Sequence, residues 1–369
     1  MSLHDKYNLT KIINARGVFT PLGVSRSTKK ICDDVSQSLS EFFIIDELQS
    51  LASSKISELT GSEAGCVTHC TSSSISLSIA GIMTGTTSDK ILLLPNATQM
   101  KHKVVIPKGH VINYGHSILQ DINITGATPI ITGTESNCTL NDLEESLSLS
   151  NVGCLLLVSS RLVKDNELDF KEAIILAKKY NIPTIIDAAA QDFRAKELLD
   201  LGADLILLSA QKYLLSPTAG IVYGKKELVN AVYANEKGIG RSMKATKESI
   251  VGVISGIEER LNLDINKWKK EQEEKLIYFI NSVNTIYSLN AISVSDYTNL
   301  PFSRACLSID KNQSKITTCE LSKLLKSNSP EIWTIDNECK NNKLIFELVP
   351  LCMEEVNVIL EKLTFYLDS

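Results

Sequence analysis

The sequence predicts an α/β protein in three layers, with a mostly parallel sheet covered by helices on both faces. Short apolar runs alternate with segments whose apolar residues recur at helical spacing, such as "DFKEAIILAKKYN" and "AKELLDLG". Between Gly126 and Lys212 the runs are apolar at nearly every position, which is typical of buried parallel strands. In order, the apolar runs are "KILLLP", "KVVIP", "TPIITG", "GCLLLVSS", "PTIIDAA", "ADLILLSA" and "GIVYG".

The chain is predicted to divide into three parts. An N-terminal arm, residues 1–25, precedes a large α/β domain over residues 26–250. From Ile250 the pattern changes to a long charged helical stretch, followed by the strand-like "RACLSID" and "NKLIFELVP" and by a closing helix, "MEEVNVILEKLTFYL". Residues 251–369 are therefore predicted to form a connecting helix and a small α+β domain.

Composition restricts the partners and the compartment. With 38 Lys and Arg against 43 Asp and Glu, the net charge of −5 offers no general attraction for nucleic acid or for an anionic membrane. The N-terminus "MSLHDKYNLTK" lacks an apolar signal core, so we expect a cytoplasmic protein with no membrane partner. The nine cysteines include no CxxC pair and predict free thiols rather than a metal site.

Two titratable residues are predicted to lie at one edge of the sheet. Asp187 ends one apolar run, and Lys212 lies just past the next. Ligands of open parallel sheets bind outside the carboxyl ends of the strands, where helix N-termini also point. Taken singly, Asp187 is better explained as a helix cap and Lys212 as a solvated loop lysine, and only the combination favours a ligand site.

A hydroxyl-rich turn completes a pattern that favours a cofactor site. Cys70, Thr71, Ser72 and Ser73 open a predicted helix whose free N–H groups suit a dianion. An acid, a lysine 25 residues later and such a turn are what pyridoxal 5'-phosphate requires. The lysine forms a Schiff base, the carboxylate keeps the pyridine nitrogen protonated, and the turn holds the phosphate. A serine-rich helix cap is the alternative explanation of the turn.

Motifs along most of the chain carry a family resemblance. They are "IINARGVFTPLG", "IIDELQ", "ELTGSEAGCVTHCTSSS", "IPKGH", "IIDAAAQ", "GADLILLSAQK" and "GIGRSMKATKESIVG". The chain resembles the selenocysteine synthase-like branch of fold type I pyridoxal phosphate enzymes, a branch that includes selenocysteine synthase and D-glucosaminate-6-phosphate ammonia lyase. This resemblance implies a mostly parallel seven-stranded sheet and a small C-terminal α+β domain.

The resemblance assigns cofactor-binding roles to individual positions. It makes Lys212 the Schiff-base lysine, Asp187 the partner of the pyridinium nitrogen and Ala189 the small residue beneath the ring. Ser209 and the turn of residues 70–73 are implied to bind the phosphate.

Two further cofactor contacts are implied with alternatives. His110 resembles the catalytic residue that stacks over the other face of the cofactor. His116 is the alternative for this place, and a purely structural role of His110 is the other explanation. Gln191 either reaches the phenolic oxygen of the cofactor or only turns the chain.

Substrate binding is the least determined part of the predicted site. By the same resemblance, Arg241 binds an anionic group in a neighbouring subunit's site, and Asn14 and Arg16 line the substrate entrance. Solubility of the helix or a salt bridge between subunits is the alternative explanation of Arg241. Relatives tend to carry an arginine near the strand of "PEIWTIDN" that holds a substrate carboxylate, and here Ile335 stands at the nearest position. Arg304 and Arg241 are the candidates to replace it.

We therefore expect a lyase that acts on a small amino acid or amino sugar acid through α-carbanion (quinonoid) chemistry, as a homodimer or larger homo-oligomer. A racemase or an aldolase on the same scaffold is the first alternative. A tRNA-dependent selenium transferase is less favoured, because "INARG" begins near the start and leaves no room for an N-terminal RNA-binding domain. A non-catalytic relative is the last alternative.

Overall fold

The structure, a computed structural model, describes residues 2–164 and 168–367 and contains two compact units. The larger unit comprises residues 27–262, and the smaller combines residues 1–26 with 263–369. The N-terminal arm joins the small unit because β1 (Ile12–Asn14) pairs in parallel with β11 (Glu331–Trp333). Helix α11 (Lys247–Leu261) belongs to the large unit, so the division falls at residue 262 and not at the expected 250.

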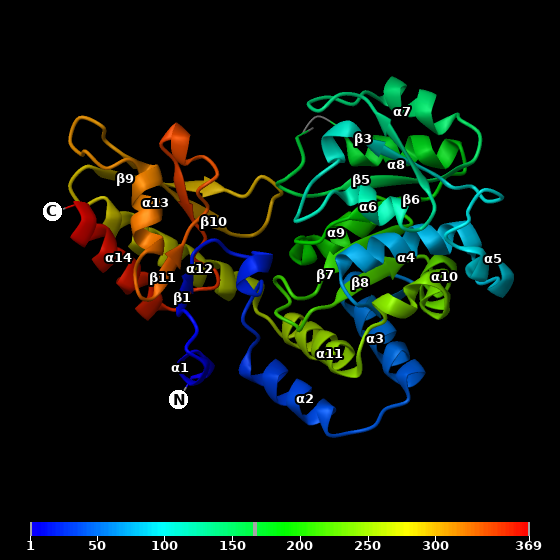
Figure 1. Cartoon of the computed structure of the whole chain (residues 1–369), viewed down its shortest axis with the longest axis horizontal. Coiled ribbons are helices and arrows are strands. Elements are labelled where there is room, and N and C mark those ends of the chain that lie inside the picture. Colours follow the sequence, from blue (N-terminus) through cyan, green and yellow to red (C-terminus); the bar gives the residue numbers. More distant parts are fainter. Residues whose placement is uncertain (1, 165–167, 368–369) are drawn as a thin grey trace. The chain divides into compact units, whose positions relative to one another are not determined.

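A seven-stranded sheet in the order β2-β8-β7-β6-β5-β3-β4 forms the centre of the large unit, as predicted for this fold (Figure 1). Six strands run in the same direction, and β8 is antiparallel to both of its neighbours. The strands are β2 (Ala64–Thr68), β3 (Lys103–Pro107), β4 (Thr128–Thr132), β5 (Val152–Val158), β6 (Thr184–Asp187), β7 (Leu205–Ser209) and β8 (Gly220–Gly224).

Helices cover both faces of this sheet, because successive side chains of a strand point to opposite sides. In β5, Leu155 and Leu157 belong to one apolar core, while Leu156 and Val158 belong to the other. The first core includes residues of α3 (Ile45–Thr60), α7 (Leu140–Leu147), α8 (Phe170–Lys179), α9 (Ala195–Asp200) and α11. The second includes residues of α4 (Thr71–Thr84), α6 (Ile118–Asn123) and α10 (Lys226–Ala234).

One apolar run was interpreted wrongly. "KILLLP" is not a strand but contributes to helix α5 (Ser88–Leu93), and Leu92 and Leu93 are exposed. Asp89 in the first turn favours the helix, since an acidic residue there interacts well with the helix dipole. The seventh strand is instead β2, formed by "AGCVT".

The small unit contains a three-stranded antiparallel sheet in the order β12-β10-β9. Its strands are β9 (Leu289–Ser295), β10 (Ser303–Ile309) and β12 (Leu344–Phe346), and its longest helices are α12 (Ile265–Val283) and the predicted closing helix α14 (Met353–Leu367). The charged stretch predicted as one connecting helix is two helices, α11 and α12, separated by residues 262–264.

Cys319 and Cys339 form a disulfide between α13 (Thr318–Lys326) and the short 3-10 helix Cys339–Asn341, with an S–S distance of 2.12 Å. The prediction that all nine cysteines are free thiols is therefore wrong for this pair, while the other seven are free. The two partners are 20 residues apart, a proximity that only the folding of the small unit creates. Within residues 2–164 and 168–367, no helix has the length and apolar character needed to cross a membrane.

Candidate active site

Asp187 and Lys212 both lie at the carboxyl edge of the sheet. Asp187 is the last residue of β6, and Lys212 follows β7 with its backbone N–H donating to the carbonyl of Ser209 at 3.0 Å. The two strands are parallel neighbours, and Asp187 is in register with Leu207. The strand order thus brings together two residues that are 25 positions apart in the sequence.

The acid and the lysine influence each other's protonation. Burial raises the pKa of Asp187 to about 6, while the nearby Lys212 charge and a 3.2 Å hydrogen bond from the Ala189 N–H work in the opposite direction. Burial also lowers the pKa of Lys212, and Asp187 opposes that change. A lysine with a lowered pKa is more often present as a neutral amine, the nucleophilic form.

Ala189 connects the two strand ends through its backbone. Its N–H donates to the Asp187 carboxylate, and its carbonyl accepts the N–H of the buried Ser209 at 3.0 Å. The side chain at this position is a single methyl group. A flat ligand can therefore approach the strand ends closely here.

The hydroxyl-rich turn lies at the N-terminus of α4. The N-cap Cys70 donates its N–H to Ser73 Oγ at 2.9 Å, and Ser73 Oγ donates to the Cys70 carbonyl at 2.7 Å. The Thr71 hydroxyl is buried without a hydrogen-bond partner in the described part of the chain. Since the first N–H groups of a helix also lack partners within it, this turn offers several donors to an anion.

Gly220 at the start of β8 lets the turn approach the sheet. A Cβ added there would lie 2.3 Å from Ser74 Oγ, 2.5 Å from the Cys70 carbonyl oxygen and 2.5 Å from Thr68 Oγ1. Two of these neighbours are a backbone oxygen and a short β-branched side chain, which have little freedom to move. The position of the turn therefore depends on a residue without a side chain.

The structure separates the two candidate histidines. His110 is fully buried: its Nδ1 accepts the Val158 N–H at 3.0 Å, and its ring lies 5.6 Å from that of Phe170. The side chain of His116 is 37% exposed, and its Nε2 lies 3.0 Å from Tyr114 Oη. Of the two histidines, His116 is therefore the one that is open to a ligand.

Asp121, near the start of α6, was missed by the sequence analysis. Its carboxylate is 3.2 Å from His116 Nε2, accepts the Ser72 hydroxyl at 2.5 Å and accepts the Tyr114 hydroxyl. Burial raises the pKa of Asp121 to about 7; Ser72 opposes this rise, and the negative charge of Asp187 adds to it. No sequence signal marked Asp121, because 49 residues separate it from Ser72.

Arg161 is a second residue that the sequence analysis missed. It lies two positions beyond Ser159, whose N–H donates to the Asp187 carbonyl at 2.8 Å. Its side chain is exposed, and its positive charge contributes to the lowered pKa of Lys212. A cation is thus present close to the lysine, in the segment that follows β5.

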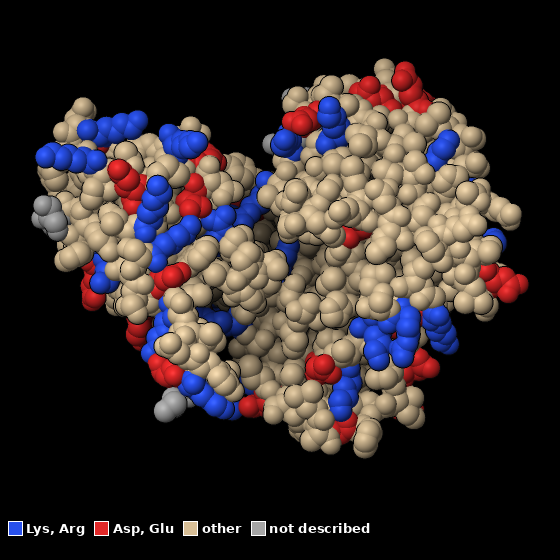
Figure 2. Space-filling model, viewed as in Figure 1, with Lys and Arg blue, Asp and Glu red and all other residues tan. Residues whose placement is uncertain are grey.

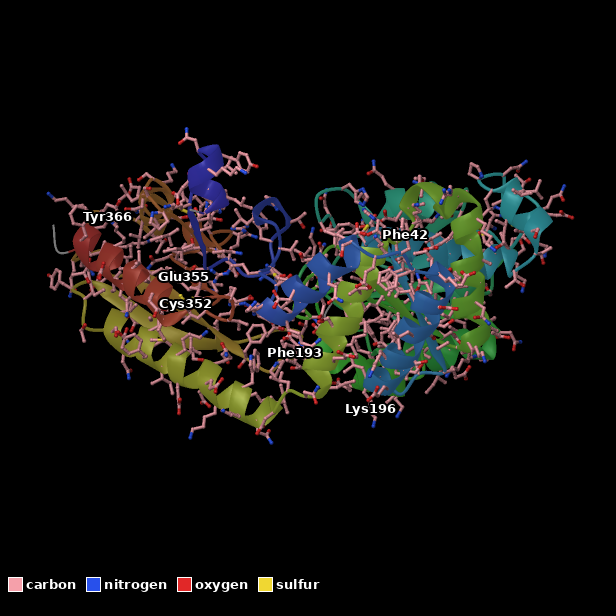
Figure 3. All side chains as sticks on the ribbon, turned by 90° about the horizontal axis from the view of Figure 1, so that it is seen from below. Phe42, Phe193, Lys196, Cys352, Glu355 and Tyr366 are labelled. Atoms are coloured by element: carbon pink, nitrogen blue, oxygen red, sulfur yellow. A yellow bond between two sulfur atoms is a disulfide. The ribbon has the colours of Figure 1, made fainter. Side chains whose placement is uncertain are left out.

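Gln191 takes part in a turn behind the strand ends. It is buried, its N–H donates to the Ala188 carbonyl at 2.8 Å, and its Oε1 accepts from Arg194 at 3.4 Å. The adjoining Asp192 is paired with Arg260 at 2.8 Å, and the Arg260 guanidinium lies 3.7 Å from the centre of the Phe193 ring, which is labelled in Figure 3. These contacts favour the chain-turning explanation of Gln191.

Arg241 lies in a separate pocket of about 700 Å³ in the large unit. The pocket has four cationic side chains, while burial raises the pKa of Glu236 at its edge to about 7. Neither Lys212 nor Asp187 lines it. The lining residues are Ile45, Tyr233, Glu236, Lys237, Arg241, Lys244, Ala245, Thr246, Lys247 and Glu248.

Arg16 and Asn14 are occupied within the small unit. Arg16 donates to the Thr334 carbonyl and to Asp336, each at 2.8 Å. Asn14 closes a local turn by donating to the Gly17 carbonyl at 2.8 Å. The hydrogen bonds of Arg16 hold the arm to the rest of the small unit and that of Asn14 stays within the arm, so the structure gives no support to a substrate-lining role.

Arg304, one of the two candidates to replace the arginine missing at Ile335, is paired with other residues. Its guanidinium forms ion pairs with Asp296 and with Glu347, the latter at 2.8 Å, and all three residues are buried. Removing Arg304 from these partners would leave two buried carboxylates unpaired, which is costly. Arg241 is the candidate that remains exposed.

Comparison with known proteins assigns the family. The sequence pattern of L-seryl-tRNA selenium transferase (SelA) matches residues 12–329. The chain belongs to the SelA family. It is 29% identical over 257 residues to D-glucosaminate-6-phosphate ammonia lyase of Salmonella typhimurium, covering 70% of this chain and 69% of that protein. It is 24% identical over 336 residues to 5'-C-glycyluridine monooxygenase-decarboxylase of Streptomyces sp, covering 90% and 84%.

A solved structure supports the fold assignment of this SelA-family chain. A structure of D-glucosaminate-6-phosphate ammonia-lyase superposes with a TM-score of 0.88 over 100% of both chains, at 23% sequence identity. The fold is that of fold type I pyridoxal phosphate enzymes, as predicted. The relatives, which include a lyase, selenium transferases and a monooxygenase-decarboxylase, are enzymes, and the chain is accordingly an enzyme.

Proposed function

We propose that the protein is a pyridoxal 5'-phosphate-dependent lyase that acts on a small amino acid or amino sugar acid. The observation that carries the proposal is the partly buried Lys212 beside Asp187 at the strand ends of a fold type I protein. When bound, the cofactor supplies an electron sink that weakens bonds at the α-carbon of an amino substrate. The residues present fit such a group.

The fit rests on features of the site itself. Lys212 would hold the cofactor through its amine, and the buried Asp187 carboxylate would hold a proton on the ring nitrogen. The partnerless Thr71 hydroxyl and the first N–H groups of α4 offer donors to a phosphate, with Ser72 and Ser73 beside them.

Further residues would complete the binding of the cofactor. We propose Cys70 and Ser209 as additional members of the phosphate site, Ala189 as the small residue against the ring and His116 as the residue over its other face. His110 is less suited to that place, because its Nδ1 is engaged by the Val158 N–H.

The proposed substrate class follows from the relatives and from charge. The match to D-glucosaminate-6-phosphate ammonia lyase, whose name contains an amino sugar acid, extends over 70% of this chain. Figure 2 shows Lys and Arg in several groups as well as scattered among Asp and Glu, and the chain as a whole has a net charge of −5. The net negative charge favours a small substrate over tRNA, since it gives no general attraction for nucleic acid. We further infer a cytoplasmic homodimer; seven of the nine cysteines form no disulfide, as in a reducing compartment, and the Cys319–Cys339 pair is the exception.

The test is to locate the cofactor and then the activity. Purified protein incubated with pyridoxal 5'-phosphate should absorb visible light, and borohydride should remove that band and fix a pyridoxyl group on Lys212, as seen by peptide mass spectrometry. Lys212→Ala is the control that should give no adduct. Ammonia release is then measured over a panel of amino acids and amino sugar acids. An adduct on another lysine would overturn the assignment.

A further inference from the structure

Asp121 is a buried acid placed directly beside the turn that we propose binds a phosphate. It is 4% exposed and accepts the hydroxyl of Ser72, the second residue of α4, at 2.5 Å. Its backbone carbonyl accepts the Ser76 hydroxyl at 2.9 Å, which fastens α6 to the next turn of α4. A carboxylate is an unexpected neighbour for an anion, because two like charges in a partly buried site repel strongly.

The groups around Asp121 can share one proton. Three residues with titratable or hydroxyl groups contact it, Ser72 from α4 and Tyr114 and His116 from the preceding loop, and the charge of Asp187 in β6 also acts on it. Burial raises the pKa of Asp121 to about 7, and the charge of Asp187 adds to the rise. A substantial fraction of Asp121 is therefore neutral at physiological pH.

The protonation state of Asp121 decides what the Ser72 hydroxyl can donate to. When Asp121 is ionised it only accepts hydrogen bonds, so the hydrogen of Ser72 is directed at Asp121 and is lost to an anion in the turn. When Asp121 is protonated, its own O–H can donate to Ser72 Oγ, and the Ser72 hydrogen is free to turn toward the anion. Protonation also removes the repelling charge.

We propose that Asp121 is a positioning residue of the anion-binding turn, which takes up a proton when a dianion binds and thereby releases the Ser72 hydroxyl to the anion. The proposal rests on the proposed function, because it takes this turn as the phosphate site. The affinity of the turn for a dianion should therefore decrease as the pH rises through the range in which Asp121 ionises in the protein without a bound anion. It also links the turn to His116, which contacts the same carboxylate.

Sulfate is a suitable probe, because it remains a dianion throughout the pH range of interest. Sulfate is titrated calorimetrically into the full-length protein freed of cofactor, in two buffers of different ionisation enthalpy, so that the difference in heat counts protons. We expect uptake of about one proton per sulfate at pH 8 and an affinity that falls about 25-fold between pH 6.5 and 8.5.

Three variants separate this proposal from other sources of the pH dependence. Asp121→Asn keeps the shape of the side chain and should abolish proton uptake. His116→Gln should retain it, because the proton belongs to Asp121. Ser72→Ala should weaken sulfate binding at pH 6.5, which locates the sulfate at this turn and not in the basic pocket of Arg241.

The proposal is overturned if Asp121→Asn retains the proton uptake, if His116→Gln alone loses it, or if sulfate does not bind at pH 6.5. Should Asp121→Asn fail to fold, ¹³C NMR of the wild-type carboxyl gives the same answer: sulfate must raise the pKa of Asp121, and an unchanged value refutes the proposal. The adduct on Lys212 tests the proposed function separately, so the two failures can be told apart.

Discussion

Asp187 is a residue at which function and stability oppose each other. Its carboxyl is 4% exposed, and burial raises its pKa to about 6 from an ordinary 3.8. Ionisation of Asp187 therefore lowers the free energy of unfolding, because the same carboxyl ionises more easily in the unfolded chain. Holding such a group in place is expected of an active site, where chemistry requires the charge.

Replacing Asp187 with asparagine should stabilise the cofactor-free protein by about 1–3 kcal/mol at pH 8. Because the folded-state pKa is raised, the wild-type penalty is absent below pH 4, grows between pH 4 and 6 and is constant above. Thermal unfolding of both proteins across this range measures the difference. The same variant should lose its activity with the cofactor.

Asp204→Asn is the matched control for this prediction. Asp204 is also buried, but it accepts the Thr184 N–H at 2.7 Å and pairs with Lys225 at 2.7 Å. Its replacement should destabilise the protein, since it breaks an ion pair that the fold satisfies. A variant at Asp187 that is less stable than wild type at pH 8 would contradict the first expectation.

At the level of elements, the site depends on the close packing of α4 against β8. The antiparallel pair of β2 and β8 places Thr68 opposite Gly220, directly behind the N-cap of α4. No space remains there for a side chain. The packing therefore fixes the position of the turn relative to the ends of the strands.

Gly220→Ala should displace the N-terminus of α4 and destabilise the fold by about 1–3 kcal/mol. Because the displaced atoms belong to the anion-binding turn, the affinity for pyridoxal 5'-phosphate should fall by more than the affinity for pyridoxal, which lacks the phosphate. Fluorescence titration with both compounds measures this.

Gly65→Ala in the paired strand β2 is the control, since the nearest atoms to its added Cβ belong to the side chain of Ile56 and not to the anion-binding turn. This variant should lose stability but keep the wild-type ratio of the two affinities. Equal ratios in both variants would show that Gly220 has no special relation to the phosphate.

For the whole molecule, an exposed apolar patch lies beside the basic pocket. Phe42, labelled in Figure 3, is fully exposed in the link before α3, and Leu39 and Ile44 near it are also exposed. Lys247, a lining residue of the pocket, donates to the carbonyls of Leu39 and Glu41. Several exposed apolar side chains within one short segment often mark an interface, which supports our proposal of a dimer.

A mixture of two inactive variants tests whether such a dimer shares its sites. If Arg241 acts in the partner's site, Lys212→Ala and Arg241→Ala subunits form hybrid dimers in which one of the two sites is intact. Random exchange makes about half of the dimers hybrid, so activity should recover to about a quarter of the wild-type value. No recovery after demonstrated subunit exchange would rule out the shared site.

A large part of this molecule follows from its sequence. Local sequence patterns predict three of its features, because strand and helix periods and cap residues act over a few positions. These are the continuous apolar runs from β4 to β7, the sheet edge that carries Asp187 and Lys212, and the hydroxyl-rich start of α4. The run "KILLLP" was misleading, since apolar content alone does not distinguish a short helix from a strand.

Only the tertiary structure decided which distant residues meet. The pairing of Asp121 with Ser72, the enclosure of Arg304 by Asp296 and Glu347, and the disulfide between Cys319 and Cys339 join residues from separate elements. The tertiary structure also buries the His110 side chain in the core and leaves the His116 side chain partly exposed. Such contacts depend on the order of strands and on how helices pack across them, and a carboxylate acquires its pKa from these surroundings and not from its own sequence neighbours.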